Sequence, residues 1–289
     1  MRFIKSLSLA LITFSITVSK SLVGGDSLFE YGTTVGDVET APNDDGSGPE
    51  LTLPEKMFFF SEDGVTKVYQ NTNGLISFED PVATYNALQF PSTEFPRMIA
   101  AYWTDIDTRS GGDGNKLYAR TTTRQEDIDI ALPLIKNCTN SLYCKDATDF
   151  EPKFSSVFSY VQVNPYTIDQ DTTQTNSFQV GLIYDELKTW VVLSYENITF
   201  FDPESSSNSS IIGFNHEFGI GNSTYLLSNV TSTSMMQDLM SSSNCGRAGV
   251  YVYNVYNVVP ETIGFLPFLI LEFIFEAIGS VFNFIFFCF

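Results

Sequence analysis

Residues 65–78, VTKVYQNTNGLISF, decide the class of fold. Both halves of this stretch are rich in β-branched and aromatic residues. The Asn73-Gly74 dipeptide between them is a strong signal for a type I′ hairpin turn. Upstream, Met57-Phe-Phe-Phe60 precedes the turn residues Glu62-Asp63-Gly64, so a further strand should pair with residues 65–69. The sequence therefore predicts consecutive antiparallel hairpins in this region.

Similar runs recur along the chain, bounded by Gly, Asn, Asp or Pro, whereas helix signals are few and the best is residues 232–240. Residues 37–54 and the serine-rich 205–210 predict loops. We expect one all-β domain, an antiparallel sandwich-like fold with few short helices, plus a hydrophobic C-terminal helix. The further predicted strands are residues 98–103, 116–123, 157–163, 177–184, 190–195, 211–214 and 249–255.

The N-terminal residues 1–21 are predicted to be a signal peptide. Arg2, Lys5 and Lys20 flank an uncharged, largely apolar run, residues 6–19, which ends in small residues typical of a cleavage site. This run is short for a membrane span. We therefore expect the chain to enter the secretory pathway.

The C-terminal residues 264–289 form a hydrophobic segment with nine phenylalanines, long enough to cross a bilayer as a helix. Glu272 and Glu276 near its middle oppose insertion, and no Lys or Arg follows the segment. Three interpretations stay open: a transmembrane segment, a GPI-attachment signal, or an apolar tail that packs on the protein. We expect membrane association.

Composition excludes several functional classes. The chain has 15 Lys and Arg against 34 Asp and Glu, a formal net charge of −19. A nucleic-acid partner is not expected, because binding to phosphates needs a basic surface. The single histidine, His216, rules out a multi-histidine metal site and is expected at a strand end rather than as a catalytic base.

Two aspartates are the best candidates for chemistry. Asp105 and Asp107 would point to one face of a strand, roughly 6–7 Å apart. Together with Asp113 in a glycine-rich stretch they could bind Ca²⁺, which favours clustered oxygen ligands. They could also act as the carboxylate pair of a secreted hydrolase. The simpler interpretation is that they hold the following turn and pair with Arg109.

Because the chain is expected to be exported, we expect a disulfide bond and N-glycosylation. Cys138–Cys144 is the first choice for a disulfide. Cys245 stays open as an alternative partner or as a free, buried or intermolecular thiol, and Cys288 lies in the apolar segment. The Asn-x-Ser/Thr sequons begin at Asn137, Asn197, Asn208, Asn222 and Asn229.

Several motifs together resemble one family. The ordered set includes LFEYG at residues 28–32, residues 71–78 NTNGLISF, and residues 95–109, which contain AAYWTDIDTR. This set is similar to the NIDO, or nidogen-like, extracellular domain over about residues 28–256. The residues that match its motifs are Gly36, Asp37, Asn73, Gly74, Trp103, Asp105, Asp107, Arg109, Phe178, Gln179, Gly213, Phe214 and Asn215.

The resemblance implies a non-enzymatic role in cell-matrix adhesion or matrix organisation, with no catalytic residue and no cofactor. The expected partner is an extracellular matrix or cell-surface protein, bound by surface complementarity to the acidic chain. A secreted carboxylate-dependent hydrolase and a calcium-dependent structural module remain the alternatives.

Overall fold

The computed structural model describes residues 27–60, 63–88, 90, 92–110, 114–139, 144, 147–167, 172–201, 209–215 and 225–255. The expected signal peptide, the hydrophobic segment 264–289 with its expected helix, and His216 lie outside these residues. Within the described part of the chain, neither helix has the length and apolar character that crossing a membrane would need.

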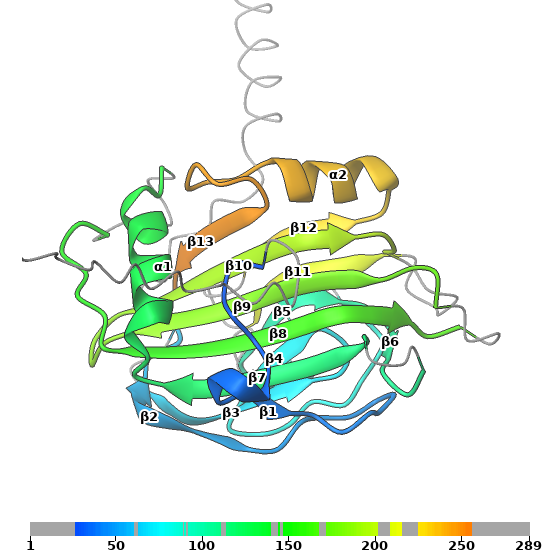
Figure 1. Ribbon diagram of the computed structural model, residues 1–289, viewed down its shortest axis with the longest axis horizontal. Helices are drawn as coiled ribbons and strands as arrows, with labels where there is room; N and C mark the ends of the chain where they lie inside the picture. The colour runs from blue at the N-terminus through cyan, green and yellow to red at the C-terminus, as the bar shows by residue number, and fades with distance from the viewer. Residues whose placement is uncertain are drawn as a thin grey trace, which may run out of the picture.

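The fold consists of two antiparallel sheets packed face to face (Figure 1). The strands are β1 Val38–Glu39, β2 Leu51–Met57, β3 Val65–Asn71, β4 Leu75–Phe78, β5 Met98–Trp103, β6 Ile106–Asp107, β7 Lys116–Thr122, β8 Phe154–Pro165, β9 Asn176–Tyr184, β10 Thr189–Ile198, β11 Ser210–Asn215, β12 Tyr225–Val230 and β13 Val250–Asn254. The first sheet has the order β1-β7-β8-β9-β10-β13, with β6 beside β8, and the second has the order β12-β11-β5-β4-β3-β2. The all-β expectation is confirmed.

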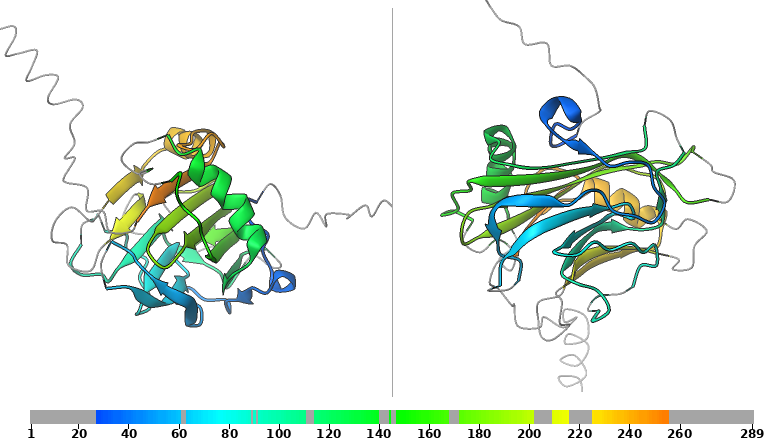
Figure 2. Two further views of the ribbon diagram at one scale, coloured as in Figure 1. Left: turned by 90° about the vertical axis from the view of Figure 1, so that its left-hand side faces the viewer. Right: turned by 90° about the horizontal axis from the view of Figure 1, so that it is seen from below.

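Both faces of the central strands are buried. In β10, Val191 and Leu193 point into the main core between the sheets, while Trp190 and Val192 point to the outer face of the first sheet. The helix α1 (Gln125–Lys136) covers that outer face (Figure 2). The outer face of the second sheet, around Trp103, is covered by the connection between β4 and β5. Burial on both faces is the reason the strands read as nearly continuous apolar runs.

The Asn73-Gly74 turn differs from the type I′ turn expected. A type I′ turn needs positive φ at both central residues. Here only Gly74 has positive φ, at 79°, and the connection between β3 and β4 has three residues, 72–74. The Asn73 side chain instead accepts a hydrogen bond from the Ile106 N–H at 2.8 Å. The dipeptide therefore links the hairpin to β5 and β6 as well as reversing the chain.

Several element boundaries were wrong. The strand expected at residues 57–60 ends at Met57, because Phe59 and Phe60 leave the sheet and pack inside the core. The predicted loop 37–54 contains β1 and the start of β2. The expected helix at residues 232–240 is confirmed as α2 (Thr233–Ser241). The sequence reasoning missed α1 and β12, and β6 holds Asp107 but not Asp105 of the strand expected to carry both.

Candidate functional site

A pocket of about 260 Å³ lies between the two sheets at the side of the molecule that α2 covers. Its inner wall is apolar and buried, and comes from both sheets: Leu193 and Tyr195 of β10 and Ile212 of β11. Tyr251 and Tyr253 of β13 line a second side. Met235 and Leu239 of α2 form a third side, so the pocket depends on how this helix is placed.

Local contacts fix α2 over the pocket. The Ser232 side chain accepts a hydrogen bond from the Met235 N–H at 3.3 Å, a typical helix N-cap. Met236 is buried, and Met240 lies against β10, where its sulfur accepts the Ile198 N–H at 3.2 Å. Because methionine side chains are flexible, this helix face can adjust its packing.

The pocket tyrosines offer their rings rather than their hydroxyls. The Tyr195 hydroxyl donates to the Ala101 carbonyl at 2.7 Å, and the Tyr251 hydroxyl donates to the Leu239 carbonyl at 3.1 Å. The two rings meet edge to face, with centroids 6.1 Å apart. With these hydroxyls bonded to main-chain carbonyls, the surface that Tyr195 and Tyr251 offer a ligand is aromatic.

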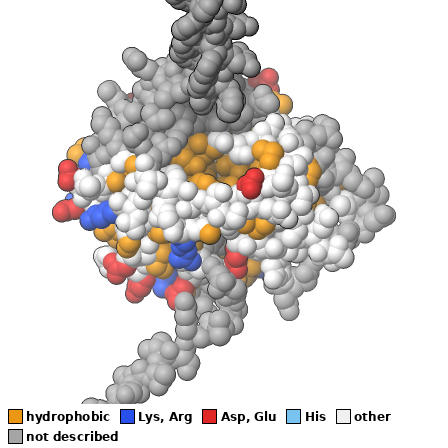
Figure 3. Space-filling model, turned by 90° about the horizontal axis from the view of Figure 1, so that it is seen from above, with side chains coloured by type: hydrophobic (Ala, Val, Ile, Leu, Met, Phe, Trp, Pro, Cys, Tyr) orange, Lys and Arg blue, Asp and Glu red, His pale blue; other side chains and the backbone are white. Residues whose placement is uncertain are grey.

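Asp238 is the one charged residue among the described residues that line the pocket. It lies exposed on α2. Burial raises the pKa of Tyr251, and the nearby Asp238 carboxylate raises this pKa further. Figure 3, which looks onto this side of the molecule, shows apolar side chains gathered in a hollow with an acidic group beside them. The pocket thus combines an apolar interior with a negative rim.

The two aspartates expected to act together, Asp105 and Asp107, are not both free carboxylates. Asp107 accepts three hydrogen bonds from Arg109: from the main-chain N–H at 2.8 Å, from Nε at 2.9 Å and from Nη2 at 2.9 Å. Burial opposes ionisation of Asp107, but these bonds outweigh it and lower its pKa. Arg109 also pairs with Asp44 at 2.8 Å. The arrangement holds the turn after β6.

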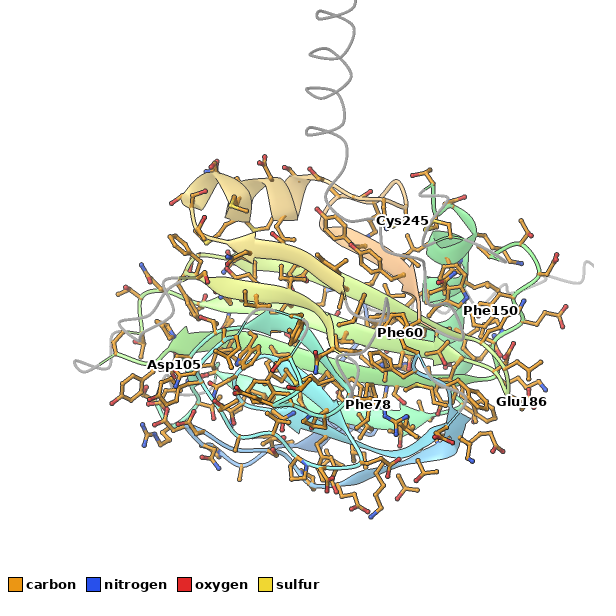
Figure 4. All side chains as sticks on the ribbon, turned by 180° about the vertical axis from the view of Figure 1, so that it is seen from behind. Phe60, Phe78, Asp105, Phe150, Glu186 and Cys245 are labelled. Carbon is orange, nitrogen blue, oxygen red and sulfur yellow. A yellow bond between two sulfur atoms is a disulfide. The ribbon has the colours of Figure 1, made fainter. Side chains whose placement is uncertain are left out.

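Asp105 is buried, and its main-chain carbonyl accepts the Tyr166 N–H at 3.1 Å. Figure 4 labels it at one end of the molecule, far from Cys245. Asp113 lies outside the described residues. Over the described ranges, no group of three or more His, Cys, Asp or Glu side chains could hold a metal ion.

A buried ion network was missed by the sequence reasoning. Arg120 of β7 donates to both carboxylate oxygens of Asp127 at 2.9 and 2.6 Å, and to Asp37 at 2.7 Å. All three side chains are at most 4% exposed. Burial is the largest influence on Asp37 and raises its pKa. The available signal was an arginine inside a predicted strand, since such a charge needs buried partners.

The matching family residues mainly hold the fold together. The Gln179 side chain accepts the Phe29 N–H at 2.9 Å and donates to the Phe29 carbonyl at 2.9 Å, like a strand partner. Phe178 stacks on Tyr160 with centroids 4.4 Å apart. Asn215 binds main-chain groups of the β4–β5 connection at Ser92, including the Ser92 N–H at 3.0 Å. These residues are buried and do not form a reactive cluster.

The structure contains a disulfide between Cys138 and Cys144, with Cα atoms 5.5 Å apart. Cys245 is a free, buried thiol whose sulfur lies 3.4 Å from the Val250 carbonyl oxygen. Burial raises the pKa of this thiol. Cys288 lies outside the described residues.

Three of the five sequons fall within the described residues. Asn137 is exposed at the C-terminal end of α1, whereas Asn197 and Asn229 are partly buried. The Asn197 side-chain amide donates to the Thr175 carbonyl at 3.0 Å. Asn208 and Asn222 lie outside the described residues. Of the described sequons, Asn137 presents the most accessible amide.

Comparison with known proteins identifies the family. The nidogen-like domain model matches residues 66–257. Mouse alpha-tectorin is 30% identical over 179 residues, which are 61% of this chain and 8% of tectorin. Mouse nidogen-1 is 26% identical over 244 residues, 79% of this chain and 19% of nidogen-1. Dendrite extension defective protein 1 of Caenorhabditis elegans is 29% identical over 172 residues, 59% of this chain and 14% of that protein.

The chain spans less than a fifth of the length of these relatives. No solved structure matches it. The family model covers well over half of the chain and includes Asn73-Gly74, the Asp105–Arg109 stretch and the β9 motif. The chain therefore belongs to the nidogen-like domain family.

Proposed function

We propose that this protein is a non-enzymatic extracellular module for cell-matrix adhesion or matrix organisation. The observation that carries the proposal is the family match over residues 66–257, to a domain also present in nidogens and tectorins. A structural role of the family residues supports the proposal, because those described act in packing, turns and hydrogen bonds that stabilise the sheets.

The alternative of a carboxylate-dependent hydrolase gains no support from the geometry. A hydrolytic carboxylate pair must face the substrate with one group free to donate or accept a proton. Asp107 is bound to Arg109 through both carboxylate oxygens, and Asp105 is buried. A panel of glycoside and ester substrates tests this alternative, and turnover that is lost in Asp105→Asn would establish it.

The proposed location is the cell surface or the extracellular matrix. Residues 1–21 would direct export, and residues 264–289 would tether the protein to a membrane as a span or through a GPI anchor. Asn137, exposed beside α1, is the described sequon best placed to carry a glycan. Site-specific mass spectrometry of the exported chain would measure its occupancy.

Solid-phase binding to decellularised matrix tests the proposed role. We expect the full chain to bind and the binding to weaken several-fold as salt rises from about 50 to about 300 mM, because a −19 chain should favour basic partners. The heat-unfolded chain, with the same composition, is the control for non-specific adhesion. Binding no stronger than that of the unfolded chain would contradict the proposed role.

A further inference from the structure

We infer that the pocket beneath α2 receives an apolar side chain from a protein segment in which a lysine or arginine adjoins that side chain. This inference rests on the proposed function as a binding module, and it assigns one part of the surface to one class of partner.

The volume of the pocket sets the size of the occupant. At about 260 Å³ it is larger than the roughly 150 Å³ cavity that can hold benzene, and smaller than the roughly 300–1,000 Å³ typical of drug-sized ligands. One aromatic or long aliphatic side chain, with part of a neighbouring residue, fits this space. The pocket therefore matches a protein anchor residue better than a whole metabolite.

The chemistry of the walls selects an apolar group. Leu193 and Ile212 are at most 2% exposed and form the inner wall, and the Tyr195 hydroxyl is bonded to the Ala101 carbonyl. Burying an aromatic anchor against such walls removes apolar surface from water, and aromatic anchors dominate the energetics of many interfaces. Met235 lines the α2 side of the pocket, and its flexible side chain can repack around the anchor.

The charge at the rim selects the neighbour of the anchor. Asp238 is exposed, and among the described residues that line the pocket neither Lys nor Arg is present to neutralise it. The half-buried Tyr251 lies beside it, and aromatic rings also attract cations. The −19 charge of the chain opposes an acidic segment. A basic residue next to the anchor meets both the carboxylate and the ring.

Methionine-methyl NMR of the full chain tests the inference with three capped peptides. Acetyl-Gly-Phe-Lys-Gly-amide carries the anchor and the charge, the Phe-Gln peptide lacks the charge, and the Ala-Lys peptide lacks the anchor. We expect shifts at the Met235 methyl, none at the buried Met57 and Met98, and about fivefold tighter binding of Phe-Lys than of Phe-Gln. The Ala-Lys peptide should not bind measurably.

Two variants and one control separate the contribution of the Asp238 charge from that of the apolar pocket. Asp238→Asn should equalise the Phe-Lys and Phe-Gln affinities, and Ser242→Trp, at the rim, should abolish both. Asp129→Asn, an exposed carboxylate on α1, should change nothing. Equal affinities in the unmodified chain would overturn the inference, as would tighter binding of octyl glucoside, which would indicate an acyl-chain site. If the peptides bind as expected but the Ser242→Trp variant still binds matrix, the pocket is not the matrix site. If the peptides bind but the unmodified chain does not bind matrix, the result contradicts the proposed function and leaves the pocket inference standing.

Discussion

At the scale of single residues, the buried Arg120 is partnered by two buried carboxylates. Arg120 joins the N-terminal segment, β7 and α1 through Asp37, the Glu30 carbonyl and Asp127. Such buried networks add little net stability when intact, but removing one partner leaves the other charges buried and unpaired. These residues therefore specify which segments meet.

We predict that Arg120→Ala lowers the free energy of unfolding by about 3–5 kcal/mol. The physical reason is that two buried carboxylates, Asp37 and Asp127, lose their shared cation. Urea unfolding followed by tryptophan fluorescence measures the change, and Lys153→Ala, which removes an exposed pair with Glu186, is the matched control. A loss equal to that of the control would refute the structural role of the network.

Asp107 gives a prediction about pH. Because Arg109 lowers the pKa of Asp107 in the folded state against the effect of burial, the pair stabilises the fold above the unfolded pKa of about 3.9. This stabilisation is lost as the pH falls through the lower folded pKa. Asp107→Asn should cost about 1 kcal/mol at neutral pH and flatten the stability curve below about pH 4. Unfolding curves measured from about pH 2.5 to about pH 7 check this. If the free energy of unfolding of the variant falls in acid as steeply as that of the unmodified chain, the prediction is wrong.

The same pairing bears on calcium. Both carboxylate oxygens of Asp107 are bonded to Arg109, so binding Ca²⁺ there would first require breaking these bonds. We predict that a calcium chelator leaves the Tm of the full chain unchanged within about 1 °C, since the pair with Arg109 already satisfies this carboxylate. Differential scanning fluorimetry with EDTA and with excess Ca²⁺ measures this. A fall in Tm with EDTA that Ca²⁺ reverses would restore the calcium-dependent alternative.

At the scale of elements, the turn between β3 and β4 closely approaches the backbone of β5. A Cβ on Gly74 would lie 2.1 Å from the Tyr102 carbonyl oxygen, and Gly74 has φ of 79°. Gly246 has nearly the same φ, 82°, but a Cβ added there would meet no atom within 4 Å. Comparing alanine substitutions at the two glycines therefore separates the cost of a steric clash from the cost of backbone strain.

We predict that Gly246→Ala costs about 1 kcal/mol, from the left-handed backbone alone. Gly74→Ala should cost at least about 3 kcal/mol, because β4 and β5 must also move apart. Chemical denaturation of the two variants side by side measures the difference. Equal losses in the free energy of unfolding would show that the close approach of Gly74 to β5 adds no cost beyond the left-handed backbone.

Much of the β architecture was predictable because its signals are local. The strands around residues 65–78, 98–103 and 177–184 follow from β-branched and aromatic runs that end at turn residues. The helix α1 was not predicted, because Pro133 lies inside it and proline is normally a helix breaker. β12 and the departure of Phe59 and Phe60 from the sheet depend on tertiary contacts that no short window contains.

The candidate site was less predictable than the fold. Its walls come from β10, β11, β12, β13 and α2, and each contributes ordinary core residues such as Leu193 and Ile212. Nothing in the local sequence distinguishes a residue that lines a pocket from one that fills a core. Asp238, the one charged residue of the pocket within the described part of the chain, looks like any exposed helix residue until the fold brings the tyrosines of β13 beside it.

At the scale of the whole molecule, the chain is strongly acidic, and its described family residues help to hold two packed sheets together. Such a design leaves surface loops and the pocket under α2 as the places where partners can bind. The family relationship to nidogens and tectorins supports a location outside the cell.

The most direct test of this proposed function is fractionation of the full chain expressed in animal cells. Medium, carbonate-resistant membrane and detergent-insoluble matrix are collected, and the chain in each is quantified by mass spectrometry. We predict that most of the chain is outside the cytosol, lacks residues 1–21, and is retained in the matrix or membrane fraction. A chain found with residues 1–21 intact in the cytosol, or free in the medium with no retained fraction, would contradict the proposal that it is an adhesion or matrix module.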